Sequence, residues 1–143
     1  MSELNSFYSA WTPRLLGVLR IITGFLFTAH GSQKLLNYPV SEHGGVALAS
    51  FMGFAGALEL VGGALILVGL FTRPAAFILS GTMAVAYFTA HAPGGFLPIV
   101  NKGELAVIYS FLFLYMSVSG GGAFSLDGLV RNSGNGRATA RTV

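Results

Sequence analysis

The stretch that decides the fold runs Arg20-Ile-Ile-Thr-Gly-Phe-Leu-Phe-Thr-Ala-His-Gly-Ser-Gln-Lys34. It is strongly apolar, although it carries three ionisable side chains. On a helix at about 100° per residue, one set of residues, which includes all three, falls within roughly one third of the circumference. The set is Arg20, Thr23, Gly24, Phe27, His30, Gly31 and Lys34. A helix with one polar, small-residue stripe suits a membrane bundle in which the stripe faces inward, away from lipid.

The composition of the whole chain also indicates an integral membrane protein. Of its 143 residues, 53% are hydrophobic and 9% are charged, whereas soluble domains carry about 25% charged residues. The chain has no Cys, which excludes disulfides, thiolate metal sites and a cysteine-based electron relay. The net charge of +3 comes largely from Arg131, Arg137 and Arg141. This pattern favours contact with anionic headgroups at the cytoplasmic face, and it does not predict nucleic-acid binding.

The pattern predicts an all-α, four-transmembrane-helix bundle over residues 14–128. The expected helices cover residues 14–36, 46–71, 75–91 and 104–120, and each has roughly the 17–25 residues that a bilayer requires. Residues 1–13 are expected to form a polar lead, 96–100 a lid at the interface, and 129–143 a disordered cytoplasmic tail. An even number of helices places both termini on one side. The excess of arginine there favours both termini in the cytoplasm and a bacterial inner (cytoplasmic) membrane location.

Ionisable residues occur on a plausible inward stripe of each helix. In the helix expected over residues 104–120, Glu104 shares this stripe with Val107, Ile108, Phe111 and Tyr115. At about 1.5 Å per residue, His30 and His91 both lie roughly 24–27 Å from the cytoplasmic end of their helices. Glu59 lies slightly deeper, while Lys34 and Glu104 lie near the histidines. A buried charge costs about 2.5–3.5 kcal/mol on insertion scales, so Glu59 is expected to be paired or protonated.

The best partners of Glu59 by depth are His30 and Lys34, with Arg20 second. Plainer interpretations remain open for each residue. Arg20 can extend to the inner interface along its own stem, and Lys34 or Glu104 can be simple interfacial charges. The histidines can make ordinary interhelical hydrogen bonds, and the glycines of residues 53–69 can serve close helix packing.

Several segments together resemble the DoxX family of small membrane proteins. They include Arg14-Leu-Leu followed by Arg20, His30-Gly-Ser-Gln-Lys-Leu35, and Glu59-Leu-Val-Gly-Gly63. A further segment runs Gly69-Leu-Phe-Thr-Arg-Pro-Ala-Ala76, and His91 also fits. The resemblance implies a four-helix membrane protein. It also implies a link to quinone-coupled sulfur oxidation, to membrane oxidoreductase assemblies or to resistance against thiol or quinone stress.

The leading hypothesis is a quinone-linked redox subunit that receives or delivers electrons through a partner oxidoreductase. Quinone chemistry requires protons as well as electrons, and His30, Glu59 and His91 are the predicted catalytic residues. Residues predicted to contact the cofactor are Arg20, Phe27, Lys34, Tyr87 and Glu104. The alternatives are a non-enzymatic scaffold or binder of a lipid or small hydrophobic ligand, and a haem held by His30 and His91. A homo-oligomer is also compatible with the aromatic face of residues 109–115.

Overall fold

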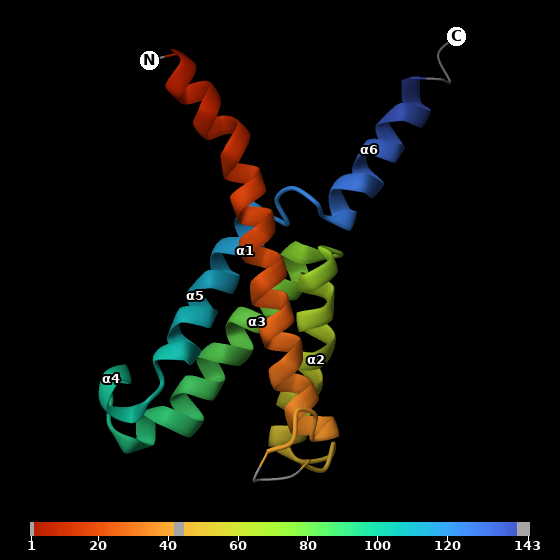
Figure 1. The fold of residues 1–143 in the computed structure, drawn as a ribbon. Helices are drawn as coiled ribbons and strands as arrows, with labels where there is room; N and C mark the ends of the chain where they lie inside the picture. The colour runs from red at the N-terminus through yellow and green to blue at the C-terminus, as the bar shows by residue number, and fades with distance from the viewer. Residues whose placement is uncertain (1, 42–44, 140–143) are drawn as a thin grey trace.

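The computed structural model describes residues 2–41 and 45–139, and within these ranges the chain is all helical and has no strand. The long helices are α1 (Ser2–Leu36), α2 (Phe51–Val68), α3 (Thr72–Ala86) and α5 (Glu104–Ser119). Helix α1 packs along α2, and α3 packs along α5. Figure 1 shows that both ends of the chain lie at the same end of this bundle, from which the first half of α1 projects.

Shorter elements join and extend the four helices. The end of α3 continues through a π-helical turn, Tyr87–His91, and a 3₁₀ turn, Ala92–Gly94. The short helix α4 (Pro98–Asn101) leads into α5, and α6 (Leu126–Thr139) follows it. In Figure 1 helix α6 and the start of α1 diverge from the same end of the bundle. The connections after α1 and before α5 lie at the opposite end.

Glycines allow α1 and α2 to approach until their backbones touch. A Cβ on Gly24 or Gly31 of α1 would lie closer than 3.0 Å to the backbone of α2, at Leu67 and Leu60 respectively. From the other side, a Cβ on Gly63 would lie 2.6 Å from the amide nitrogen of Thr28. Small residues serve this purpose in membrane helices because no hydrophobic driving force holds helices together in lipid. The predicted packing role of the α2 glycines is thereby confirmed at Gly63.

The core is centred on Phe27, which is buried between the two helix pairs. Its ring lies 4.8 Å from that of Phe113 and 5.4 Å from that of Tyr109, both in edge-to-face geometry. Further buried side chains complete the cluster: Ile66, Ala75, Ala76, Leu79, Met83 and Met116. Helices α3 and α5 are also tied by a reciprocal pair, since the hydroxyls of Ser80 and Ser110 each donate to the other's carbonyl oxygen at 2.8 and 3.1 Å. Aromatic and aliphatic packing therefore fixes how the two pairs meet.

Arg20 is fully buried and is compensated by backbone carbonyls instead of an acidic side chain. Its guanidinium donates to the carbonyl oxygens of Ile66 and Leu67, at the end of α2, at 2.8 and 2.5 Å. It also donates to Gly121 and Phe124, in the loop after α5, at 2.9 and 3.0 Å. The carbonyls that end a helix carry partial negative charge and lack helical partners. Arg20 therefore joins α1 to α2 and to the 121–124 loop.

Three helical segments are long and apolar enough to cross a membrane, namely Glu3–Leu36, Phe51–Val68 and Thr72–Gly94. Helix α5 is equally apolar but has 16 residues. Three of the predicted spans therefore have the length and apolar character that a crossing requires, and a fourth crossing stays a prediction.

The first helix begins earlier than predicted. We expected a polar lead over residues 1–13, whereas α1 starts at Ser2 and continues through Pro13. A proline removes only one N–H from the helical ladder. The Thr12 hydroxyl donates to the carbonyl of Tyr8 at 2.7 Å in this same turn. The helix therefore crosses the proline without ending.

The end of the chain also differs from the prediction of a disordered tail over residues 129–143. Helix α6 extends to Thr139, and residue Arg141 lies outside the described residues. Ser125 provides the start signal, because its Oγ accepts the N–H of Gly128 at 3.2 Å. A serine cap with an aspartate in the first turn favours helix initiation. The predicted lid at 96–100 corresponds to a loop and the single-turn helix α4.

Candidate functional site

A cavity of about 150 Å³ lies between all four long helices, toward the end of the bundle opposite the termini. It brings together His30, Lys34, Glu59 and His91. Apolar and aromatic side chains complete its wall: Phe27, Met83, Ala86, Leu105, Ala106 and Tyr109. A few polar groups in a mostly apolar cavity are typical of a small-molecule site.

Glu59 forms an ion pair with Lys34, as the depth argument predicted. The Lys34 Nζ lies 2.5 Å from Glu59 Oε1, and the two side chains are 31% and 3% exposed. The second carboxylate oxygen, Oε2, is buried and has no hydrogen-bond partner among the described residues. An unpaired buried acceptor costs about 1–3 kcal/mol. The ion pair therefore satisfies one oxygen and leaves one acceptor inside the protein.

His91 lines the cavity and is held by a backbone contact and a ring contact. Its Nδ1 lies 3.1 Å from the carbonyl oxygen of Asn101. A carbonyl only accepts hydrogen bonds, so this contact assigns the proton to Nδ1 and leaves Nε2 as an acceptor in the neutral ring. The π-helical turn that carries His91 is a geometry often found at functional sites. Like Glu59, His91 therefore offers a lone pair.

Tyr87 supports His91 and does not line the cavity. Their rings stack with centroids 6.4 Å apart and an interplanar angle of 22°. The Tyr87 hydroxyl donates to the carbonyl of Phe96, and the amide of Asn101 lies 3.4 Å from the same hydroxyl. Tyr87 thus fixes the loop whose Asn101 carbonyl orients the imidazole. Direct cofactor contact by Tyr87 stays a prediction.

Two other predicted contact residues also lie outside the cavity. Arg20 is at the opposite part of α1, bound to carbonyls, and does not act as the second partner of Glu59. Glu104 is exposed in the first turn of α5, while the next two residues of that helix line the cavity. A carboxylate at the start of a helix is favoured there by the helix dipole and needs no buried partner.

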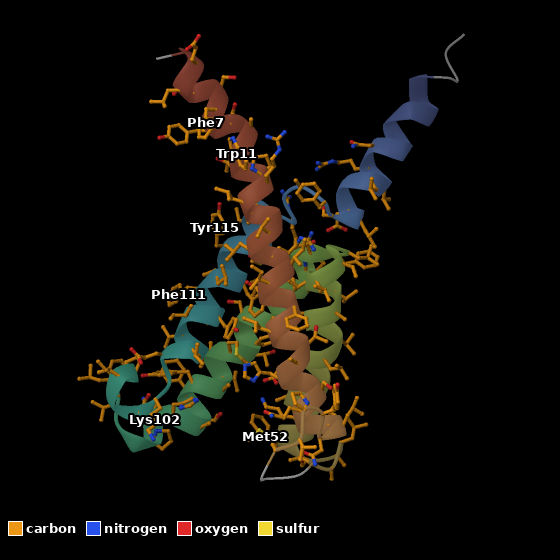
Figure 2. The ribbon with its side chains drawn as sticks, in the orientation of Figure 1. Phe7, Trp11, Met52, Lys102, Phe111 and Tyr115 are labelled. Atoms are coloured by element: carbon orange, nitrogen blue, oxygen red, sulfur yellow. The ribbon has the colours of Figure 1, made fainter. Side chains whose placement is uncertain are left out.

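The face of α5 was predicted wrongly. We expected Glu104, Val107, Ile108, Phe111 and Tyr115 to face inward, whereas Ile108, Phe111 and Tyr115 are exposed. Figure 2 shows Phe111 and Tyr115 on the outer side of α5. The buried face instead carries Ala106, Phe113 and Met116.

Sequence reasoning therefore missed the residues that α5 gives to the cavity, above all Tyr109. It also missed Met83 of α3, which lies one helical turn before Tyr87 and on the same stripe as Ser80. The spacing of Ser80, Met83 and Tyr87 was a usable signal, because all three are buried on one face. For Tyr109 the sequence holds no comparable signal, since apolar residues surround it on every side.

A second, mostly apolar cavity adjoins the site. It measures about 330 Å³ and shares Ala106 with the first cavity. Its other lining residues are Ala84, Tyr87, Phe88, Phe96, Pro98, Val107, Ser110 and Phe111. The smaller, polar cavity is well below the roughly 300–1,000 Å³ of drug-sized ligand sites. It is too small for a haem macrocycle between His30 and His91, so the haem hypothesis is not supported by the size of the site.

These features define a class: an all-helical membrane protein with a polar cavity between its helices. The family model for DoxX matches residues 15–92, more than half of the chain. An uncharacterized protein of Haemophilus influenzae is 48% identical over 122 residues, which cover 82% of this chain and 91% of that protein. The chain belongs to the DoxX family, which confirms the resemblance seen in its motifs.

Two further relatives match over most of their length. The uncharacterized membrane protein Rv3486 of Mycobacterium tuberculosis is 32% identical, with 89% of this chain and 92% of that protein covered. A Bacillus subtilis protein, "Putative oxidoreductase CatD", is 28% identical, with 86% and 92% covered. No solved structure matches the chain significantly.

Proposed function

We propose that this DoxX protein crosses a bacterial inner membrane four times, with both termini in the cytoplasm. The 16 residues of α5 extend about 24 Å at the helical rise, close to the hydrocarbon thickness of about 30 Å. A fourth crossing by α5 agrees with the position of both chain ends at one end of the bundle (Figure 1). Arg14 and Arg73 lie toward that end and Lys34 toward the other, which agrees with the positive-inside rule.

We propose that the polar cavity binds the head of a quinone or quinol, and that the chain acts as a quinone-linked redox subunit with a partner oxidoreductase. The observation that carries the proposal is the unpaired Oε2 of Glu59, which lines the same cavity as His91, whose Nε2 is left as an acceptor. A ligand with two hydroxyl groups would satisfy both acceptors. A quinol head is such a ligand, and a cavity of roughly 150 Å³ accommodates one six-membered aromatic ring.

The chemistry follows from those two acceptors. Oxidation of a quinol releases two protons and two electrons as its two O–H bonds break and the quinone forms. The Glu59 carboxylate and the His91 Nε2 would each take one proton, while the partner oxidoreductase would accept both electrons. Lys34 holds the other oxygen of Glu59, and exposed His30 at the edge of the cavity would exchange protons with the surroundings. In the reverse direction the same groups supply the protons for quinone reduction.

The experiment is a binding titration of a short-chain quinol and its quinone against purified protein. Glu59→Gln replaces an ionised acceptor with a neutral amide, and a lost charge-assisted hydrogen bond of about 1.5–3 kcal/mol weakens quinol binding roughly 10-fold or more. Glu104→Gln is the matched control, because it removes a carboxylate of the same charge that does not line the cavity. His30→Ala and His91→Ala complete the series. Equal affinity of the wild type and Glu59→Gln, or no binding to either, would refute the proposal.

The second candidate is a non-enzymatic binder of a lipid or another hydrophobic molecule. The neighbouring apolar cavity of about 330 Å³ favours it, since it offers a surface with almost no polar group. Identification of the molecule that copurifies with the protein separates the two candidates. A bound acyl lipid, together with no electron transfer when oxidoreductase partners are added, would support the binder.

A further inference from the structure

A separate, larger cavity of about 500 Å³ lies at the end of the bundle that carries both termini. Its wall is formed by the start of α3, the glycine-rich loop after α5 and the first turns of α6. Two arginines line it, Arg73 and Arg131, and both are exposed. Within residues 2–41 and 45–139, neither guanidinium forms an ion pair or a hydrogen bond. Two positive charges thus border this cavity without a partner.

The one acidic residue in the wall is already engaged by backbone groups. Asp127 accepts the N–H of Phe71 and the N–H of Thr72, each at 2.8 Å, through its two oxygens. Burial by itself raises the pKa of Asp127. The N–H groups of Thr72 and Phe71 and the nearby charge of Arg20 outweigh burial, so the pKa lies below its ordinary value. Asp127 therefore caps the start of α3, and it neither neutralises the two arginines nor leaves that helix terminus open.

The Thr72 hydroxyl in the cavity wall acts on Asp127 and is not open to a ligand. Thr72 is fully buried, and its Oγ1 is enclosed as well. Together with the N–H groups, this hydroxyl helps to lower the pKa of Asp127. It lies beside Gly121, where a Cβ would approach this oxygen to 2.9 Å. The two arginines, and not this hydroxyl, are therefore the polar contacts that the wall offers to a ligand.

We propose that this cavity binds a phosphate group, presented by an anionic phospholipid headgroup or by a soluble phosphate. Guanidinium groups match the geometry of phosphate oxygens and bind them through parallel hydrogen bonds. The volume lies within the roughly 300–1,000 Å³ of small-molecule sites, so a phosphate and its glycerol or other ester fit. The proposal concerns the end of the bundle remote from Glu59, and it does not depend on the quinol site.

The test uses the full chain in phosphatidylcholine nanodiscs, with native mass spectrometry to count bound lipid as phosphatidylglycerol is titrated. We expect preferential binding of phosphatidylglycerol. Loss of one charge-assisted contact in Arg73→Gln or Arg131→Gln should weaken it about tenfold or more. Arg14→Gln is the matched control, because Arg14 lies toward the same end but packs over Trp11, 5.6 Å from its ring centre, and does not line the cavity.

A second arm distinguishes the two sources of phosphate. Inorganic phosphate is titrated by calorimetry into the same protein in phosphatidylcholine alone. Phosphate binding with the same dependence on Arg73 and Arg131, without a preference for phosphatidylglycerol, would support a soluble ligand. The proposal is overturned if neither ligand binds, or if Arg14→Gln weakens binding as much as the two cavity variants. Melting temperatures of all variants establish that each one is folded.

Discussion

Replacement of Arg20 by glutamine tests whether the carbonyl contacts of this buried arginine hold the bundle together. The guanidinium makes four hydrogen bonds of 2.5–3.0 Å to four different carbonyl oxygens. A glutamine amide can donate only two hydrogens, so at least two of the four carbonyls lose their donor. At about 1.5–3 kcal/mol for each bond to a charged group, the expected loss is about 3–6 kcal/mol. That is a large part of the 5–15 kcal/mol typical of a folded domain.

The assay is reversible unfolding in mixed micelles, followed by circular dichroism, for the wild type, Arg20→Gln and Arg14→Gln. Arg14 is a matched control, since it is exposed and its guanidinium packs on the Trp11 ring. We expect Arg14→Gln to unfold within about 0.5 kcal/mol of the wild type, as surface substitutions usually do. A stability of Arg20→Gln equal to that of Arg14→Gln would refute the reasoning, because it would mean that the carbonyl contacts contribute nothing net.

Three further predictions follow from close packing and from the other two compensated charges. Gly24→Ala should destabilise the protein and separate α1 from α2, because the added Cβ would meet the α2 backbone. Gly81→Ala has open space around its added Cβ and should be neutral or stabilising by up to about 1 kcal/mol. Thermal melts of both variants compare them directly. Asp127→Asn should destabilise the protein at neutral pH. The pKa of Asp127 is depressed in the folded protein, so the wild-type advantage is present above the unfolded pKa and is lost as the pH falls through the folded pKa. Melting temperatures of the two proteins should therefore converge as the pH falls below about 4. A difference that stays constant with pH would contradict this prediction. Lys34→Met leaves Glu59 buried without its cation. The expected loss of stability is at most about 3 kcal/mol, since Lys34 is 31% exposed and a fully buried pair costs about 3–5 kcal/mol to break. The double variant Lys34→Met/Glu59→Gln should regain stability, and additive effects in this double-mutant cycle would argue against the pair.

The sequence was most informative where a charge had to lie in an apolar segment. Most of the inward stripe of α1 is buried as predicted, with His30 as the exposed exception, because ionisable groups are expensive in lipid. The same argument, combined with helical depth, named Lys34 together with His30 as the best partners of Glu59, and Lys34 is the one that forms the ion pair. It also placed His30 and His91 at one level, and the structure has both at a common cavity.

The sequence was least informative where no polar residue marked a face. Helix α5 is apolar on every side, so periodicity could not show that Ala106, Tyr109 and Phe113 turn inward. The partners of Arg20 were also beyond side-chain reasoning, because backbone carbonyls leave no pattern in a sequence. The extension of α1 through Pro13 depends on local hydrogen bonding that composition does not reveal. These errors share one cause: the deciding partner was backbone or was uniformly apolar.

The way each charge is compensated distinguishes Glu59 from Arg20 and Asp127. Arg20 directs its guanidinium at four carbonyls, and Asp127 uses both oxygens to cap α3, so each is engaged within the fold itself. Glu59 has a partner for only one of its two oxygens, although it is almost as buried as Arg20. If the pair served only to hold α1 against α2, a neutral hydrogen-bonded pair would do so at lower desolvation cost, because burying charges is expensive even when they are paired. A carboxylate with one acceptor left over is instead suited to accept a bound hydroxyl, which is the property that the proposed quinol site requires.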